Sequence, residues 1–178
     1  MINKDSLDLG VIILCPDRKE ASLKITVSSV KYHLYNRDVI SVVGNDASPH
    51  DFKKFKELCP TYKGRETLAS LINTGFKRLE HEWGLLIFAG GRFCQFTERK
   101  FYFAQDEKDI LFPVVDINRS FLNASLDGVL INKKTFDAIG DWPEYTHENG
   151  FDDSKLVWTA GAQEYGCKFK AIVGLRII

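Results

Sequence analysis

The stretch GLLIFAGGRF at residues 84–93 decides the architecture of this chain. Four large apolar residues in succession, at positions 85–88, are typical of a strand that is buried on both faces, as in a parallel sheet. The strand pattern stops at Gly90 and Gly91, and glycines at a strand end let another backbone or a ligand come close. We therefore expect a buried strand whose end, followed by Arg92, forms part of a binding site.

Strand and helix patterns alternate outward from this stretch. Continuous apolar runs predict strands at 9–15 and 39–44, and apolar residues at helical spacing predict helices at 21–35, 50–59 and 66–81. Residues 60–64 predict a turn.

Beyond residue 93 the patterns are less regular. They predict, in order, a helix at 97–107, a strand at 109–115 broken by Pro113, a strand turning into a short helix at 127–140, a helix at 152–166 and a strand at 167–178. The whole pattern indicates one α/β domain over residues 1–178, a three-layer α/β/α sandwich with a mainly parallel, mixed central sheet.

The composition excludes several classes of protein. A chain of 178 residues that is 44% hydrophobic can bury one sizeable core. Lys plus Arg and Asp plus Glu each number 24, so we expect no nucleic-acid partner. No apolar run is long enough to span a bilayer and the start lacks a signal-peptide pattern, which predicts a cytoplasmic protein without a transmembrane segment. The four cysteines have no CxxC spacing, which argues against a zinc site or a disulfide framework.

The ends of the three clearest strands carry polar or glycine residues. They read Pro16-Asp17-Arg18, Asn45-Asp46-Ala47-Ser48 and Ala89-Gly90-Gly91-Arg92. Ligands of open α/β sheets bind at the carboxyl ends of the strands, where a carboxylate can accept from a base or ribose and backbone N–H groups can bind phosphate. Each end taken alone is also typical of an ordinary turn.

Taken in order, these segments and three others resemble a GT-A glycosyltransferase of the family 2 kind. The resembling segments are VIILCPDRKEASLKITVSSV at 11–30, Asn45–Ser48 for the usual Asp-Asp-Gly-Ser, Ile72–Gly75 for Arg-Asn-x-Gly, LDGVLINKKTFDAIGDWPE at 126–144, and GFDDSKLVW at 150–158 for Gly-Gly-Glu-Asp-x-x-Leu. The resemblance covers nearly the whole chain. It implies a nucleotide-diphospho-sugar transferase-like fold with a nucleotide-binding half at 1–93 and an acceptor-side half at 94–178.

The chain departs from the family at its metal motif. The family's Asp-x-Asp, which holds a divalent metal on the donor diphosphate, falls on Ala89-Gly90-Gly91. Glycine carbonyls without a carboxylate make a weak site for Mg or Mn, so no metal is expected as a certain cofactor. The negative charge of the leaving group then needs another cation. The candidates are Arg92, Arg18, Lys63 and Arg65, because arginine in particular binds phosphate oxygens bidentately.

The resemblance also assigns roles to residues. The expected nucleotide-sugar-binding residues are Pro16, Asp17, Arg18, Asp46, Arg65, Asn73, Gly90, Gly91 and Arg92. Asp153 matches the base that deprotonates the acceptor hydroxyl in an inverting transfer, with Asp152 beside it. Both acids also fit ordinary capping of a helix N-terminus. Trp142, His147 and Glu148 are predicted on the acceptor side.

The predicted function is transfer of a sugar from a UDP- or GDP-linked donor to a glycan or small-molecule acceptor that the sequence does not identify. A catalytically inactive module that binds a nucleotide or glycan stays open as an alternative. A nucleotidyltransferase is a further alternative, although it would need paired acids that residues 89–91 lack. The chain is short for the family, so we expect an acceptor lid either to be missing or to be supplied by a second subunit, as in a homodimer.

Overall fold

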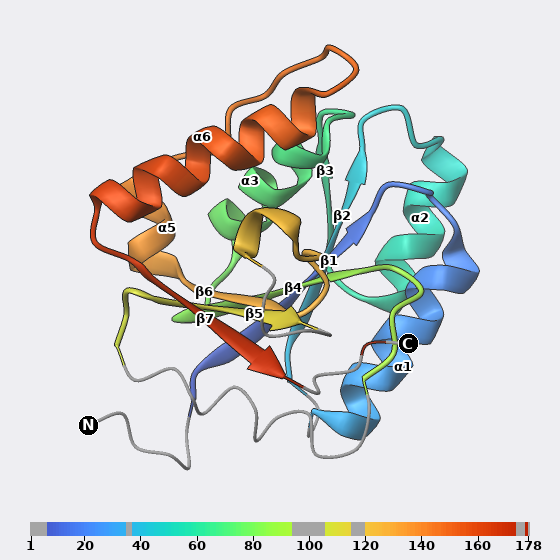
Figure 1. The fold of residues 1–178 in the computed structure, drawn as a ribbon. Helices are drawn as coiled ribbons and strands as arrows, with labels where there is room; N and C mark the ends of the chain where they lie inside the picture. The colour runs from blue at the N-terminus through green and yellow to red at the C-terminus, as the bar shows by residue number, and fades with distance from the viewer. Residues whose placement is uncertain (1–6, 35–36, 94–105, 115–119, 174–176, 178) are drawn as a thin grey trace.

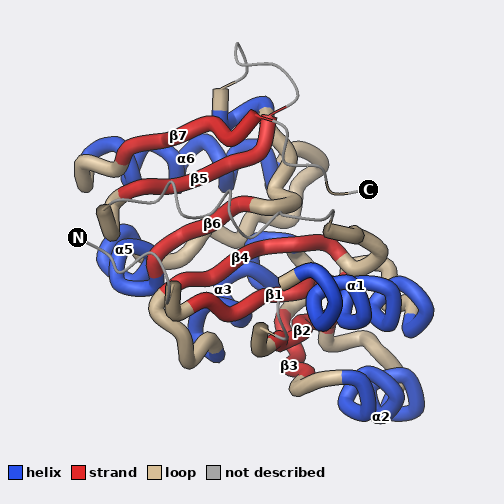
Figure 2. The backbone as a smooth tube through the Cα atoms, turned by 90° about the horizontal axis from the view of Figure 1, so that it is seen from below, coloured by secondary structure: helices blue, strands red, loops and turns tan. Residues whose placement is uncertain are grey.

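The computed structural model describes residues 7–34, 37–93, 106–114, 120–173 and 177, which form a three-layer α/β/α sandwich (Figure 1). The strands are β1 (Leu9–Cys15), β2 (Val39–Gly44), β3 (Thr61–Gly64), β4 (Trp83–Phe88), β5 (Asp109–Val114), β6 (Val129–Asn132) and β7 (Lys168–Val173). They form one sheet in the order β3-β2-β1-β4-β6-β5-β7 (Figure 2). β6 runs antiparallel to β4 and β5, and the other neighbours are parallel. The predicted sandwich with a mainly parallel, mixed sheet is confirmed.

Helices cover both faces of this sheet. They are α1 (Glu20–His33), α2 (Pro49–Leu58), α3 (Leu68–Arg78), α5 (Lys133–Ile139) and α6 (Gly150–Glu164), with a short 3-10 helix, η1 (Phe121–Asn123). Apolar residues of α1 and α2 pack on one face of the sheet, and those of α3, α5 and α6 pack on the other. Among the described residues, no helix combines the length and apolar character needed to cross a membrane.

The central strand β1 shows why its sequence is apolar throughout. Val11 and Ile13 belong to the core under α1 and α2, whereas Ile12 and Leu14 belong to the core under α3, α5 and α6. All four side chains are fully buried. A strand covered on both faces has no solvent side, so its sequence shows no alternation.

Two local predictions were wrong. Residues 61–64 form the edge strand β3, paired in parallel with β2, instead of a turn. The four residues Thr61–Gly64 are too few to show a strand period, and the pairing with β2 outweighs the local turn signal. Pro113 does not break β5, because β5 continues to Val114 beside β7. The helix predicted at 97–107 falls largely on residues outside the described ranges.

The cysteines that the structure describes are free thiols. Cys15 and Cys59 are buried and Cys167 is partly buried. Burial raises the pKa of each of these three thiols, which keeps them protonated and unreactive at neutral pH.

Two helix-interior glycines offer a matched test of the packing between α3 and β1. A Cβ on Gly75 would lie 2.4 Å from Cγ2 of the buried Ile12, whereas a Cβ on Gly161 would meet only Ile139 Cγ2 at 3.5 Å. We expect Gly75→Ala to lower the free energy of unfolding by about 1–3 kcal/mol through overpacking. Gly161→Ala, which only gains helix propensity, should raise it by up to about 1 kcal/mol. Urea unfolding measures both; a Gly75→Ala variant as stable as the wild type would contradict the close packing.

Candidate functional site

The carboxyl ends of β1, β2, β3 and β4 meet at one edge of the sheet, which we call the carboxyl edge (residues 15–18, 44–48, 64–66 and 88–92). β1 pairs with β2 on one side and with β4 on the other. The chain order of the strands therefore reverses at β1, and such a switch point is where open α/β sheets bind ligands.

An ion pair joins the tips of β1 and β2. The Arg18 guanidinium pairs with the Asp46 carboxylate, and the side chains are 43% and 35% exposed. Arg18 has a φ of 55°, the one positive φ among described residues other than glycine. A left-handed conformation costs a side-chain-bearing residue about 1–3 kcal/mol, and such strain often accompanies function. The predicted donor-site residues Arg18 and Asp46 are thus brought into contact.

Lys63 connects the β2 tip with β3. Its Nζ donates to the backbone oxygens of Asn45 at 3.4 Å and Ala47 at 3.2 Å. The ammonium group therefore lies beside the same turn that carries Asp46. Arg65, one strand end further, pairs with Glu144 at 3.3 Å and reaches the segment before α6.

Asp17 closes the turn from β1 into α1. Its carboxylate accepts from the Ser22 hydroxyl at 3.1 Å and from the Lys19 amide at 3.3 Å. Pro16 is exposed next to it. Asp17 therefore holds the turn before α1 in place without capping a helix amide, and Pro16 is a surface residue of the carboxyl edge.

The two glycines after β4 are used inside the protein. The Gly90 amide donates to Ser22 O at 2.9 Å and to Thr26 Oγ1 at 2.9 Å, and the Gly91 amide donates to Phe88 O at 3.0 Å. Their N–H groups are satisfied, so this structure does not support the expectation that they bind phosphate. Gly90 has a φ of 101°, which glycine adopts without strain, and a Cβ on Gly91 would lie 2.9 Å from Ile177 Cγ2.

Arg92, Asn73 and Trp142 are not grouped with Arg18 and Asp46. The exposed Arg92 lines a cavity of about 700 Å³ along α1, to which the tips of β1 and β2 contribute no residue. Asn73 is 3% exposed, and its amide donates to Trp142 O at 2.9 Å and accepts from Trp142 N at 2.8 Å. Trp142 is 1% exposed and stacks on Phe151 and Trp158. The expected nucleoside and acceptor contacts of Asn73 and Trp142 are not supported, because both side chains are almost fully buried and form a core contact with each other.

The start of α6 carries the predicted base. Asp153 Oδ2 lies 2.7 Å from His147 Nε2, and the two side chains are 55% and 54% exposed. Asp152 and Asp153 occupy the first helical turn, where the helix dipole favours ionised acids. The Asp152 side chain is exposed and forms no hydrogen bond within the described part of the chain. The geometry separates the two acids, since Asp153 alone contacts His147.

A cavity of about 370 Å³ lies between the start of α3 and the segment before α6. His147 and Glu148, both predicted on the acceptor side, line it together with Tyr145 and Glu66. His147 connects this cavity to Asp153. A carboxylate next to a ligand-sized cavity can remove a proton from a bound hydroxyl.

The sequence analysis singled out neither Asp127 nor Lys155, two ionisable residues whose pKa values the structure shifts. Asp127 Oδ1 accepts from the Phe88 amide at 2.6 Å, and burial raises the pKa of this carboxyl. Lys155 is buried, and its Nζ donates to Leu122 O at 3.2 Å and Ala124 O at 2.7 Å. Burial lowers the pKa of Lys155 to about 8, against an opposing effect of the Asp152 charge. In the sequence, Asp127 is simply an acid that precedes a predicted strand. The pattern does not show that this strand runs antiparallel to β4, which is what places Asp127 beside the end of β4.

The described residues do not fit a dedicated metal site. Residues 89–91 supply no carboxylate, and no group of three His, Cys, Asp or Glu side chains in the described ranges is placed to hold an ion. Asp17 and Asp46 already accept from protein donors.

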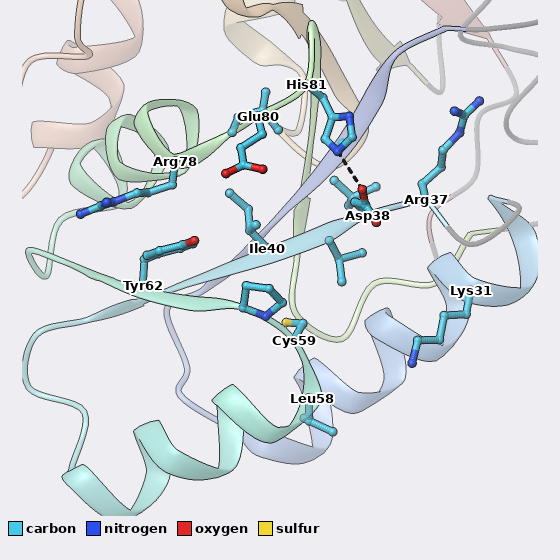
Figure 3. A pocket seen from close by; sticks show the side chains of 15 residues that line it. Lys31, Arg37, Asp38, Ile40, Leu58, Cys59, Tyr62, Arg78, Glu80 and His81 are labelled. Atoms are coloured by element: carbon cyan, nitrogen blue, oxygen red, sulfur yellow. Dashed lines mark hydrogen bonds and ion pairs between the residues drawn. The ribbon is translucent and has the colours of Figure 1, made fainter.

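A third cavity of about 460 Å³ lies at the opposite edge of the sheet, where β1 and β2 begin. Figure 3 shows Lys31 and Arg37 on one side of it, and Tyr62 and Arg78 on the other. Lys31 and Arg78 lie in the last turns of α1 and α3, where cations stabilise the negative ends of helix dipoles. This accounts for Lys31 and Arg78 without a ligand.

His81 organises that opposite edge. Its Nδ1 lies 2.6 Å from Asp8 and its Nε2 3.1 Å from Asp38. The hydrogen bond with His81 is the main cause that lowers the pKa of Asp8. A carboxyl with a lowered pKa stabilises the fold above its unfolded value of about 3.9, and this contribution is lost as the pH falls through the folded value.

We therefore expect His81→Leu, which keeps volume but donates no hydrogen bond, to lose stability at neutral pH and to show a weaker acid dependence. Urea midpoints between about pH 7 and pH 2 measure this. His50→Leu, a change at an exposed histidine of α2, is the control and should behave as the wild type. An unchanged acid dependence in His81→Leu would exclude the contact as its source.

Comparison with known proteins supports the fold. No protein-family model and no curated protein matches the sequence. Among solved structures, the mannosyltransferase PcManGT from Pyrobaculum calidifontis in complex with GDP-Man and Mn²⁺ superposes with a TM-score of 0.69 at 14% identity. The match covers 96% of this chain and 56% of that one, so the chain spans a little over half the length of that enzyme. The chain has a glycosyltransferase fold.

Proposed function

We propose that this protein transfers a sugar from a nucleoside diphosphate sugar to an acceptor hydroxyl. The observation that carries the proposal is the similarity over 96% of the chain to a mannosyltransferase solved with GDP-Man. A fold alone does not assign a function, so the side chains at the carboxyl edge supply the rest of the argument.

Donor binding is assigned to the tips of β1, β2 and β3. Asp46 accepts from the nucleoside, and the diphosphate binds to Arg18 and Lys63, whose cationic groups contact Asp46 and the turn that carries it. The Arg18 guanidinium exchanges its Asp46 partner for phosphate oxygens, which arginine binds in a fork. Because residues 89–91 offer no carboxylates to hold a metal, Arg18 and Lys63 stabilise the negative charge of the leaving diphosphate.

The chemical step is assigned to the start of α6. Asp153 accepts the proton of the acceptor hydroxyl, whose oxygen attacks the anomeric carbon while the bond to the diphosphate breaks, inverting the configuration. His147, 2.7 Å from Asp153, orients the carboxylate towards the cavity with Glu148 and Tyr145. The acceptor is proposed to bind in that cavity.

An inactive binding module is the second candidate. It is favoured by the Gly90 and Gly91 amides, which are occupied by the protein and do not extend the phosphate site. A module of this kind would bind nucleotide through Arg18 and Lys63 but would not release the sugar.

Ligand-induced stabilisation tests the donor site. We expect GDP-mannose or UDP-glucose, without metal, to stabilise the fold by about 2.7 kcal/mol at 100 times its Kd. For a chain of this size that is a rise in Tm of about 5–10 °C. Nucleoside diphosphate release, followed by chromatography, separates the enzyme from the inactive module. No shift with any nucleotide sugar, with or without Mn²⁺, would contradict both.

A further inference from the structure

Asp127 occupies the carboxyl edge although it precedes a strand. β6 runs antiparallel to β4, so the start of β6 lies beside the end of β4. Gly128 N–H donates to Leu86 O at 2.8 Å, and Phe88 N–H donates to Asp127 Oδ1 at 2.6 Å. The Asp127 carboxylate thus continues the ladder between β4 and β6 one step beyond its last backbone bond.

The segment that carries Asp127 is held in place from two sides. Lys155 of α6 donates to Leu122 O and Ala124 O, and its ammonium lies 4.8 Å from the Phe121 ring centroid. The Asp127 amide donates to Ser125 Oγ at 3.1 Å. A carboxylate on a fixed segment loses little conformational entropy when it binds a ligand.

Asp127 has acceptor capacity left over. Within the described part of the chain, the Asp127 carboxylate accepts one hydrogen bond, from Phe88 N–H, and forms no ion pair. An ionised carboxylate accepts about four hydrogen bonds, and a partly buried one with few donors is raised in pKa, as observed. Capping the ladder explains one oxygen and leaves the other free to meet a hydroxyl.

The strand order places Asp127 at one end of the proposed donor site. The site runs from Asp46 on β2 to Arg18 on β1 and then to the tip of β4, and the next strand is β6. Neighbouring strands are about 4.8 Å apart. A donor laid in this direction has its nucleoside at β2 and its diphosphate at β1 and β4. Its sugar, which follows the diphosphate, then reaches the start of β6.

We propose that Asp127 accepts hydrogen bonds from hydroxyl groups of the donor sugar and so determines the preference for the sugar part of the donor. The proposal rests on the proposed function and deepens it. Hydrogen bonds to a charged group are worth enough to change affinity about 10- to 100-fold.

Asp127→Asn is the test, because asparagine keeps an oxygen for the Phe88 amide while it removes the charge. Calorimetry measures the affinity for the free nucleotide and for its sugar conjugate, GDP with GDP-mannose or UDP with UDP-glucose. The difference between the two affinities reports the contribution of the sugar. We expect the conjugate to bind about 10- to 100-fold more weakly and the free nucleotide to bind as to the wild type. Asp137→Asn, an equal charge change on α5, should alter neither.

The outcomes distinguish the two proposals. If the wild-type protein binds none of the four nucleotides, the proposed function fails. If it binds them but Asp127→Asn weakens nucleotide and conjugate equally, or neither, the role of Asp127 is overturned. A loss seen only in the presence of Mn²⁺ would also overturn it by making Asp127 a metal ligand. Should the asparagine variant unfold, Asp127→Ser, which keeps a small acceptor, gives the same comparison.

Discussion

Replacement of Asp153 by asparagine is expected to lower the rate of sugar transfer by about 100- to 10,000-fold, because the proposed base would lose the carboxylate that accepts the proton. The change is nearly isosteric, and asparagine can still bond to His147. The affinity for the donor nucleotide and the melting temperature should therefore stay close to those of the wild type. Initial rates with the identified donor, together with calorimetry on the same preparation, measure both quantities.

The control for this experiment has to remove a charge without touching the carboxyl edge. Asp137 on α5 is exposed and pairs only weakly with Lys133 at 3.7 Å. Asp137→Asn should retain the full rate. If both variants lose the same share of activity, net charge is responsible, and Asp153 is not the base.

Replacement of Arg18 is expected to weaken binding of the nucleoside diphosphate by about 10- to 100-fold, since a hydrogen-bonded charge is removed from the phosphate site. Arg18→Ala and Arg18→Gly should lose this affinity equally, because both lack the guanidinium. Calorimetry with GDP and UDP measures the loss.

The two Arg18 variants should differ in stability. Alanine keeps the penalty of the left-handed backbone at φ 55°, while glycine adopts it at no steric cost. We expect Arg18→Gly to unfold with a free energy about 1 kcal/mol higher than Arg18→Ala. Equal stabilities would mean that the backbone relaxes, and unchanged nucleotide affinity would remove Arg18 from the donor site.

The periodicity of apolar residues predicted most of the elements around the site. β1 and β2 have the predicted bounds, and α2 begins after the Ser48 cap, whose hydroxyl accepts from the Asp51 amide. These elements are defined by local chemistry, so a local pattern finds them. β3 escaped prediction because its four residues are specified by pairing with β2.

The candidate site was predictable only for residues whose place follows from the strand that they directly succeed in the sequence. Arg18 and Asp46 follow strands that could be located, and their contact follows from neighbouring parallel strands. The burial of Asn73 depends on its hydrogen bonds to Trp142, which lies 69 residues later in the sequence, and no spacing rule connects the two residues. Asp127 was missed because its place at the carboxyl edge depends on the reversed direction of β6.

The paired hydrogen bonds between Asn73 and Trp142 have a consequence for how such a chain can change. They join a helix of the first half of the sequence to a loop of the second half, inside the core. A new acceptor half grafted after residue 93 would leave the Asn73 amide buried without partners, at a cost of about 1–3 kcal/mol. Recombination between relatives should therefore succeed only when the incoming loop brings a backbone that bonds to this asparagine.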